Sequence, residues 1–225
     1  MPVVCNTETL RHRLELHPEI VSVGEIGVEE NIIKSLSLET KTIGEVMARR
    51  LDINDAPGLF EFYTEGLSEK PRRLFAPYPL FHVPPNSAEE LSARIANWQE
   101  EDDWTALILL KKGLIIGFAL LKRFRTEQVT SAIVVRDEFL KRNLGYLLQS
   151  LVVEQACLLA VQRFHVKIIS DNAASIRLHE KCGFRQTNVL SPDIYREMFE
   201  YLSDCDKRNG KASIKRELFE MTIDL

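Results

Sequence analysis

The stretch from residue 133 to residue 146 joins the end of an apolar strand to the start of a helix through a basic turn. β-Branched residues end the strand, and apolar residues recur at helical spacing from Tyr146 onward. The first N–H groups of a helix have no intrahelical partner, and together with the positive end of the helix dipole they favour a phosphate group. The sequence therefore predicts an anion-binding turn with Lys141, Arg142, Asn143, Leu144, Gly145 and Tyr146, preceded by the strand residues Ile133, Val134 and Val135, as a cofactor-binding site.

A second stretch with unusual residue types runs from Asn172 to Phe184. Asn172 is a suitable N-cap for a helix over residues 173–182, and Gly183 is a suitable stop after it. Capping explains only these two residues. His179 is a candidate proton donor because an imidazole titrates near neutral pH, and a solvent-facing position on the helix is the alternative.

Both stretches resemble the GNAT superfamily of acyl-CoA-dependent N-acyltransferases. The pyrophosphate-loop pattern Q/R-x-x-G-x-G/A falls on residues 140–145, where Gly145 is kept while Leu140 and Asn143 depart from it. Asn tolerates the left-handed conformation better than most residues, so the turn can form without the usual Gly. The second pattern, N-x-x-A/S-I-x-L-Y/H-E-K-x-G-F, is matched by Asn172, Ser175, Ile176, Leu178, His179, Glu180, Lys181, Gly183 and Phe184.

The resemblance implies that acetyl-CoA is the co-substrate and an amine the acceptor, with no metal. In the family, the N–H of Val135 or its neighbour faces the thioester carbonyl, and Asn172 approaches the pantetheine arm. A Tyr that often serves as the acid is replaced here by His179. A Glu base that one branch places on the strand is replaced by Thr130, which leaves Glu127 as a weak substitute. A water-mediated base, or binding of the minority neutral amine, is the alternative.

The resemblance covers residues 46–187, extends more weakly to the last strand, and implies a mixed α/β fold. In the family, a mostly antiparallel sheet of six to seven strands is flanked by helices and splayed at an acyl-CoA notch. The hydrophobic patterns agree with this. They predict strands beginning at Val46 and over 104–110, 114–123, 127–135, 166–170 and 217–225, with helices over 87–102 and from Tyr146 onward.

Two segments lie outside this core, and each has its own expected role. Residues 1–45 hold eight Glu against four Lys or Arg, and they are expected to form a helix over 10–21 and a short one over 29–38. We expect this extension to pack on the main domain, 46–225; a homodimer contact or partner site is the alternative. A helical insertion at 188–214, beginning at Ser191-Pro192, is predicted to cover the acceptor pocket.

Composition limits the remaining possibilities. The chain has 225 residues, 45% of them apolar, and a net charge of −4, without a basic stripe that would suit nucleic acid. Its longest apolar runs are split by Lys111 and Lys112 and are too short for a membrane span, and the first residues do not resemble a signal segment. No C-x-x-C pair occurs among the four Cys. We therefore expect a cytoplasmic protein.

The sequence thus predicts an N-acetyltransferase that acts on a small-molecule amine or a protein lysine. The alternative is a degenerate domain of the same fold that senses acyl-CoA or binds a protein partner without catalysis, which Leu140, Asn143 and Thr130 favour. An aromatic stretch containing Phe75, Tyr78, Phe81 and His82 is predicted to line the acceptor side, with a simple hydrophobic cover as the other interpretation.

Overall fold

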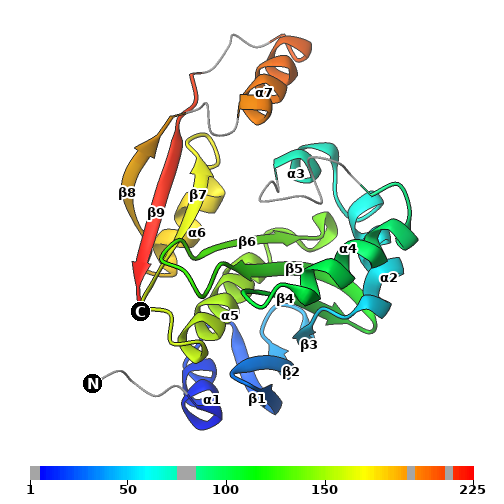
Figure 1. Cartoon of the computed structure of the whole chain (residues 1–225), viewed down its shortest axis with the longest axis vertical. Coiled ribbons are helices and arrows are strands. Elements are labelled where there is room, and N and C mark those ends of the chain that lie inside the picture. The colour runs from blue at the N-terminus through cyan, green and yellow to red at the C-terminus, as the bar shows by residue number, and fades with distance from the viewer. Residues whose placement is uncertain (1–5, 75–84, 192–195, 211–214) are drawn as a thin grey trace. The chain divides into compact units, whose positions relative to one another are not determined.

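The computed structural model describes residues 6–74, 85–191, 196–210 and 215–225 (Figure 1). The chain divides into two compact units, residues 1–164 with Leu225 and residues 165–224. The fold is mixed α/β with nine strands in the described residues, mostly antiparallel and flanked by helices. This confirms the expected fold class. The sheet has more strands than the expected six to seven because two strands precede residue 44.

The first unit contains six strands in the order β1-β2-β3-β4-β5-β6, each antiparallel to its neighbour. The strands are β1 (Ile20–Glu29), β2 (Ile32–Thr40), β3 (Gly44–Arg50), β4 (Trp104–Lys111), β5 (Leu114–Lys122) and β6 (Thr130–Val135). The α-helices are α1 (Thr7–Glu15), α2 (Ala56–Thr64), α3 (Glu69–Leu74), α4 (Ala88–Glu100) and α5 (Leu144–Leu158), with 3₁₀ turns η1 (Ile53–Asp55) and η2 (Asp137–Phe139).

The core of this unit lies between β4–β6 and the helices α2 and α4. Apolar side chains of both helices pack on alternate residues of the strands, because successive side chains of a strand point to opposite faces. Helix α5 contacts β5 and β6 as well, and Gly117 in β5 makes room for it, since a Cβ there would lie 2.6 Å from Leu148 Cδ1. The fully buried members of the core include Phe62, Leu91, Ile95, Ile108 and Phe118.

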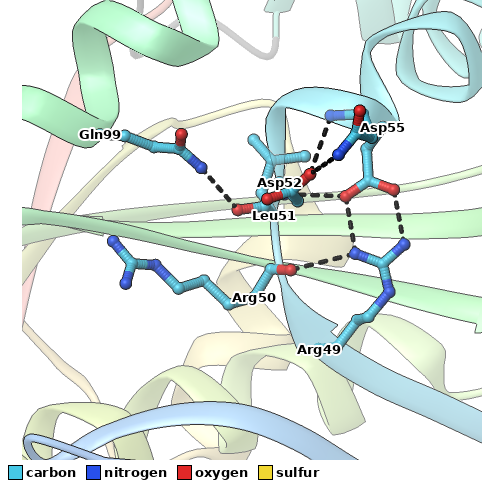
Figure 2. Close-up of polar contacts among 7 residues, drawn as sticks. Arg49, Arg50, Leu51, Asp52, Asp55 and Gln99 are labelled. Carbon is cyan, nitrogen blue, oxygen red and sulfur yellow. Dashed lines mark hydrogen bonds and ion pairs between the residues drawn. The ribbon is translucent and has the colours of Figure 1, made fainter.

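A polar corner fixes the direction in which the chain leaves β3 and enters α2. Figure 2 shows the guanidinium of Arg49 facing the carboxylate of Asp55, with N–O distances of 2.7 and 2.5 Å. Asp52 caps the turn by accepting from the N–H of Asn54, and Asp55 accepts from the N–H of Asp52. The hydrogen bond to Asp55 raises the pKa of Arg49. Gln99 of α4 donates to the carbonyl of Leu51, so both helices are tied to this corner.

Of the two helices predicted in the N-terminal residues, only the first is present. The first predicted helix exists but ends at Glu15, and β1 begins at Ile20. The second, over 29–38, was wrong, because these residues belong to the antiparallel hairpin of β1 and β2. Glu30 and Asn31 form its two-residue turn with φ of 50° and 63°, the left-handed geometry that tight hairpins use.

The second unit contains the strands β7 (Arg163–Ile169, which begins at the end of the first unit), β9 (Leu218–Asp224) and β8 (Arg185–Leu190), in that order. Helix α6 (Ala173–Lys181) follows β7, and α7 (Arg196–Arg208) lies between β8 and β9. The predicted helix start at Ser191-Pro192 falls partly outside the described residues. The notch expected between the strand ending at Val135 and that near 166–170 stays a prediction, since the two units carry one of these strands each.

Candidate active site

The turn between β6 and α5 has the backbone geometry of an anion site. Lys141 and Asn143 both lie in the left-handed region, with φ of 61° and 59°. The 3₁₀ turn η2 is closed by bonds from the N–H groups of Phe139 and Leu140. The first bond of α5 runs from the N–H of Leu147 to the carbonyl of Asn143, so the N–H groups of Leu144 and Gly145 have no acceptor within the helix. Successive N–H groups at such a helix start form a donor surface suited to phosphate.

Side chains add positive charge to this turn. Lys141 and Arg142 are exposed, and the Arg142 guanidinium lies 5.5 Å from the centroid of the Phe139 ring. Leu140, where the family pattern has Gln or Arg, is 50% exposed and brings no polar group. Leu144, Gly145 and Tyr146 form the first turn of α5. The predicted residues 141–146 therefore all lie in one turn of the first unit.

The strand residues predicted beside the thioester lie at the end of β6. Val134 and Val135 are buried, and Ile133 is partly exposed. β5 fixes the register, with Ile133 opposite Ala119 and Val135 opposite Gly117. Side chains here serve packing, so only the backbone of these residues could act on a ligand.

A buried arginine directly after β6 was not predicted as part of the site. Arg136 is 7% exposed, and its Nη2 donates to Glu61 Oε1 of α2 over 2.7 Å. This bond raises the pKa of Arg136. The next residue, Asp137, donates its N–H to the carbonyl of Gly66 and accepts from the N–H of Ser68, each over 2.9 Å. The segment that follows α2 is thus fixed to the first residues of the anion-binding turn.

The contact between Arg136, Asp137 and the segment after α2 leaves no room for a side chain at Gly66. A Cβ would lie 2.6 Å from the carbonyl oxygen of Phe62 and 3.0 Å from Arg136 Nη1. We expect Gly66→Ala to lower the free energy of unfolding by about 1–3 kcal/mol, measured by urea denaturation. Gly58→Ala in α2 is the control, since its Cβ would meet Ile115 Cδ1 at an ordinary 3.4 Å. Equal stability of the two variants would contradict this.

In the second unit, Asn172 and Ser175 occupy the start of α6. Asn172 Oδ1 accepts from the N–H of Ser175 over 3.2 Å, so the predicted N-cap is present. Gly183 has φ of 94° directly after the C-cap, as expected for a helix stop. Their expected role toward the pantetheine arm stays a prediction.

His179 lies in the interior instead of facing solvent. Its ring is 5% exposed and packs edge-on against Phe184, with centroids 5.1 Å apart. Nδ1 lies 2.8 Å from the carbonyl oxygen of Ser175, so Nδ1 carries the proton and donates it to this bond. Burial lowers the pKa of His179 to about 4. A neutral ring with its proton engaged on Nδ1 is poorly suited to protonate a thiolate, and its role as the acid stays a prediction.

Glu127 lies in the exposed turn before β6. The strand begins at Thr130 instead of residue 127, because Thr126 and Gln128 close the turn with bonds to Arg123 O and Thr126 Oγ1. Glu127 therefore does not have the strand position of a base, and its role as a base also stays a prediction. The aromatic residues Phe75, Tyr78, Phe81 and His82 lie outside the described residues.

The described residues do not meet the requirements of a metal site or of a membrane-spanning helix. Among the described residues, no group of three or more His, Cys, Asp or Glu is placed to bind a metal ion. No helix in the described ranges is long and apolar enough to cross a membrane.

Comparison with known proteins gives one family match. The family model described as "Acetyltransferase (GNAT) domain" matches residues 45–185. No protein of curated function matches the chain.

Several solved structures share the fold. The GNAT domain of S. lividans PAT is 19% identical and has a TM-score of 0.61, with 85% of this chain and 97% of that chain covered. The structure of yncA from Salmonella typhimurium with its cofactor acetyl-CoA is 20% identical, with a TM-score of 0.57 and 80% and 94% covered. Spermidine N-acetyltransferase from Vibrio cholerae in complex with CoA and spermine is 13% identical, with a TM-score of 0.58 and 80% and 95% covered.

Proposed function

Because the chain belongs to the GNAT family of acetyltransferases, we propose that it moves an acetyl or similar acyl group from acetyl-CoA to a primary amine. The acceptor is an amine of a small molecule or the side chain of a protein lysine. The observation that carries this proposal is the start of α5 after the left-handed Asn143, where the N–H groups of Leu144 and Gly145 have no acceptor within the helix. Acetyl-CoA is the co-substrate, and the cytoplasm is the expected compartment because it supplies acetyl-CoA.

In this proposal, the turn binds the pyrophosphate of acetyl-CoA. The free N–H groups and the charges of Lys141 and Arg142 hold the phosphate oxygens. The backbone at the end of β6 lies beside the thioester, where an N–H near Val135 polarises the carbonyl oxygen. Asn172 and Ser175 serve the pantetheine arm.

The reaction needs little from side chains. The neutral amine attacks the thioester carbonyl carbon, the C–S bond of the resulting tetrahedral intermediate breaks, and CoA leaves as a thiolate. The amine nitrogen loses one proton and the thiolate gains one. Holding both reactants in place supplies much of the rate. Since Glu127 is exposed in a turn and His179 is buried, we favour proton transfer through water.

A second candidate function is a domain of the same fold that binds acyl-CoA without transferring it. Two observations favour it. Leu140 places an exposed apolar side chain at the position of the usual Gln or Arg, and His179 is buried with its proton bonded to Ser175. Such a domain would still respond to acetyl-CoA by a change in stability.

Two measurements on the full chain test the proposal. Acetyl-CoA at about 100 times its dissociation constant should stabilise the native state by about 2.7 kcal/mol and raise the melting temperature by several degrees. Free thiol should then be released in the presence of at least one amine from a panel of polyamines, lysine-containing peptides and peptide N-termini. Stabilisation without thiol release for any amine would support the second candidate.

A charge-reversal variant locates the binding site. Arg142→Glu should weaken acetyl-CoA binding, because it places a negative charge beside the turn. Lys112→Glu in the exposed β4–β5 turn is the matched control and should bind like the unmodified protein. Equal affinities of the two variants, or a melting temperature that acetyl-CoA leaves unchanged, would contradict this proposal.

A further inference from the structure

The anion-binding turn adopts a conformation that its residues do not favour on their own. Lys141 and Asn143 both have positive φ, in a region where residues other than Gly are uncommon. Asn tolerates this region better than most residues, but Lys does not share that property. Contacts from elsewhere in the chain that hold this backbone are therefore of interest.

Two residues of the N-terminal segment 6–43, which lies outside the matched family region, contact the turn directly. Glu19 Oε1 accepts a hydrogen bond from Asn143 Nδ2 over 2.9 Å, and Thr42 Oγ1 donates to the carbonyl oxygen of Arg142 over 2.9 Å. One contact fixes a side chain of the turn and the other its backbone. Both residues lie in the same unit as the turn.

Glu19 is itself firmly placed between α1 and β1. Its N–H bonds to Nδ1 of His17, and its carbonyl accepts from the N–H of Lys41 over 3.0 Å. The His17 ring lies on Tyr146 with centroids 4.6 Å apart, and its Nε2 lies 3.1 Å from Ser150 Oγ of α5. Glu19 therefore approaches the turn from a segment that already rests on the first turns of α5.

The rest of the segment is held against α5 by a buried amide. Gln155 is 1% exposed, and its side chain bonds to the N–H of Ile33 and the carbonyl of Asn31, each over 2.8 Å. Beside Thr42, Lys111 donates to the carbonyl of Ile43. The segment is thus fixed at the turn between β1 and β2 and again at the turn after β2.

The contact with Glu19 also explains an unusual feature of the helix start. An Asn at the N-cap normally accepts a hydrogen bond from one of the first N–H groups of the helix. Asn143 makes no such bond, and its amide donates to Glu19. The side chain therefore does not occupy the first N–H groups of α5, and these groups stay available to a phosphate.

We propose that Glu19 and Thr42 are positioning residues, through which the N-terminal segment holds the turn 140–145 open for an anion. Their contacts compensate for the missing Gly by stabilising the left-handed backbone. The inference rests on the proposed function in one respect, namely that the anion is the pyrophosphate of CoA. A carboxylate beside bound phosphate disfavours it by charge, so the contribution of Glu19 must be geometric.

Binding of CoA to the full chain, measured by calorimetry, separates geometry from charge. Glu19→Ala should weaken binding about three- to tenfold, whereas Glu19→Gln keeps an acceptor for Asn143, loses the charge, and should bind at least as tightly as the unmodified protein. Thr42→Val should weaken binding in the same way as Glu19→Ala. The control is Glu25→Ala, an exposed carboxylate of β1 that should leave the affinity unchanged. Equal affinities of Glu19→Ala and Glu19→Gln would overturn the proposal.

Asn143→Gly supplies the second arm of the test. Since Gly has no side chain for Glu19 to hold, Glu19→Ala should have little effect in the Asn143→Gly background. The unmodified protein, Glu19→Ala, Asn143→Gly and the double variant are also compared in urea without ligand. The shifts in the midpoint of denaturation should be non-additive there as well. Additive shifts would overturn the positioning role whether or not CoA binds, while an absence of CoA binding with non-additive shifts would count against the proposed function alone.

Discussion

Replacing Arg216 by methionine is expected to lower the free energy of unfolding by about 3 kcal/mol. Its side chain is 6% exposed and bonds through Nε to Asp171 over 2.6 Å and through Nη1 to Asp206 over 2.7 Å. Asp206 is 9% exposed, and its bond raises the pKa of Arg216. Methionine would remove the ion pair with Arg216 from this buried carboxylate. We place the cost at the lower end for a buried pair, because Asp171 is 26% exposed.

The arrangement around Arg216 gives this loss a structural consequence. Asp206 belongs to α7, and Asp171 directly precedes Asn172, the N-cap of α6. The N–H of Ser170 also bonds to Glu217 O, and Ser170 Oγ accepts from the N–H of Glu217, each over 2.9 Å. Arg216 therefore joins α7 to the turn that precedes α6.

Urea denaturation of the variant and its neighbours checks the expectation. Lys215→Met, at the exposed adjacent position, should change the stability little. Combining Arg216→Met with Asp206→Asn should recover part of the loss, because the buried negative charge that Arg216 no longer compensates is then removed. A loss for Arg216→Met no larger than that for Lys215→Met would show that the ion pairs contribute no net stability.

The elements of the fold that were predicted correctly are those with strong local patterns. The runs Trp104–Leu110 and Leu114–Arg123 are mostly apolar, and they form β4 and β5 with Lys112 and Gly113 at positive φ in the turn between them. In contrast, β8 was not predicted. Its residues Arg185–Leu190 are mostly polar and exposed, so pairing with β9 defines this strand instead of burial.

The site was predictable where it is local and was missed where it depends on distant contacts. The turn at 141–145 and the left-handed Asn143 follow from residues next to one another in the chain. Glu19 lies 124 residues from its partner in the turn, and Arg136 lies 75 residues from Glu61. Such pairs leave no periodic signal in the sequence. Arg136 differs from an ordinary surface arginine only by its burial, which the sequence does not reveal.

His179 should make the stability of the protein depend on pH between 6.5 and 4. The pKa of the ring is about 4 in the folded protein, lowered chiefly by burial, against 6.5 when it is exposed. Between these values the unfolded chain binds a proton that the folded protein does not, so the stabilisation present above pH 6.5 is lost as the pH falls toward 4. The loss from this residue amounts to about 3 kcal/mol by pH 4.

Comparison with His179→Gln isolates this loss from the titration of carboxylates. Gln cannot take up the proton and keeps an N–H donor for the carbonyl of Ser175, so its stability should fall less steeply between pH 7 and 4.5. His12→Gln, at an exposed position of α1, should follow the unmodified protein. If the unmodified protein and His179→Gln lose stability in parallel, the ring must titrate as an exposed imidazole does. That result would contradict its burial and would restore His179 as a proton donor for the leaving thiolate.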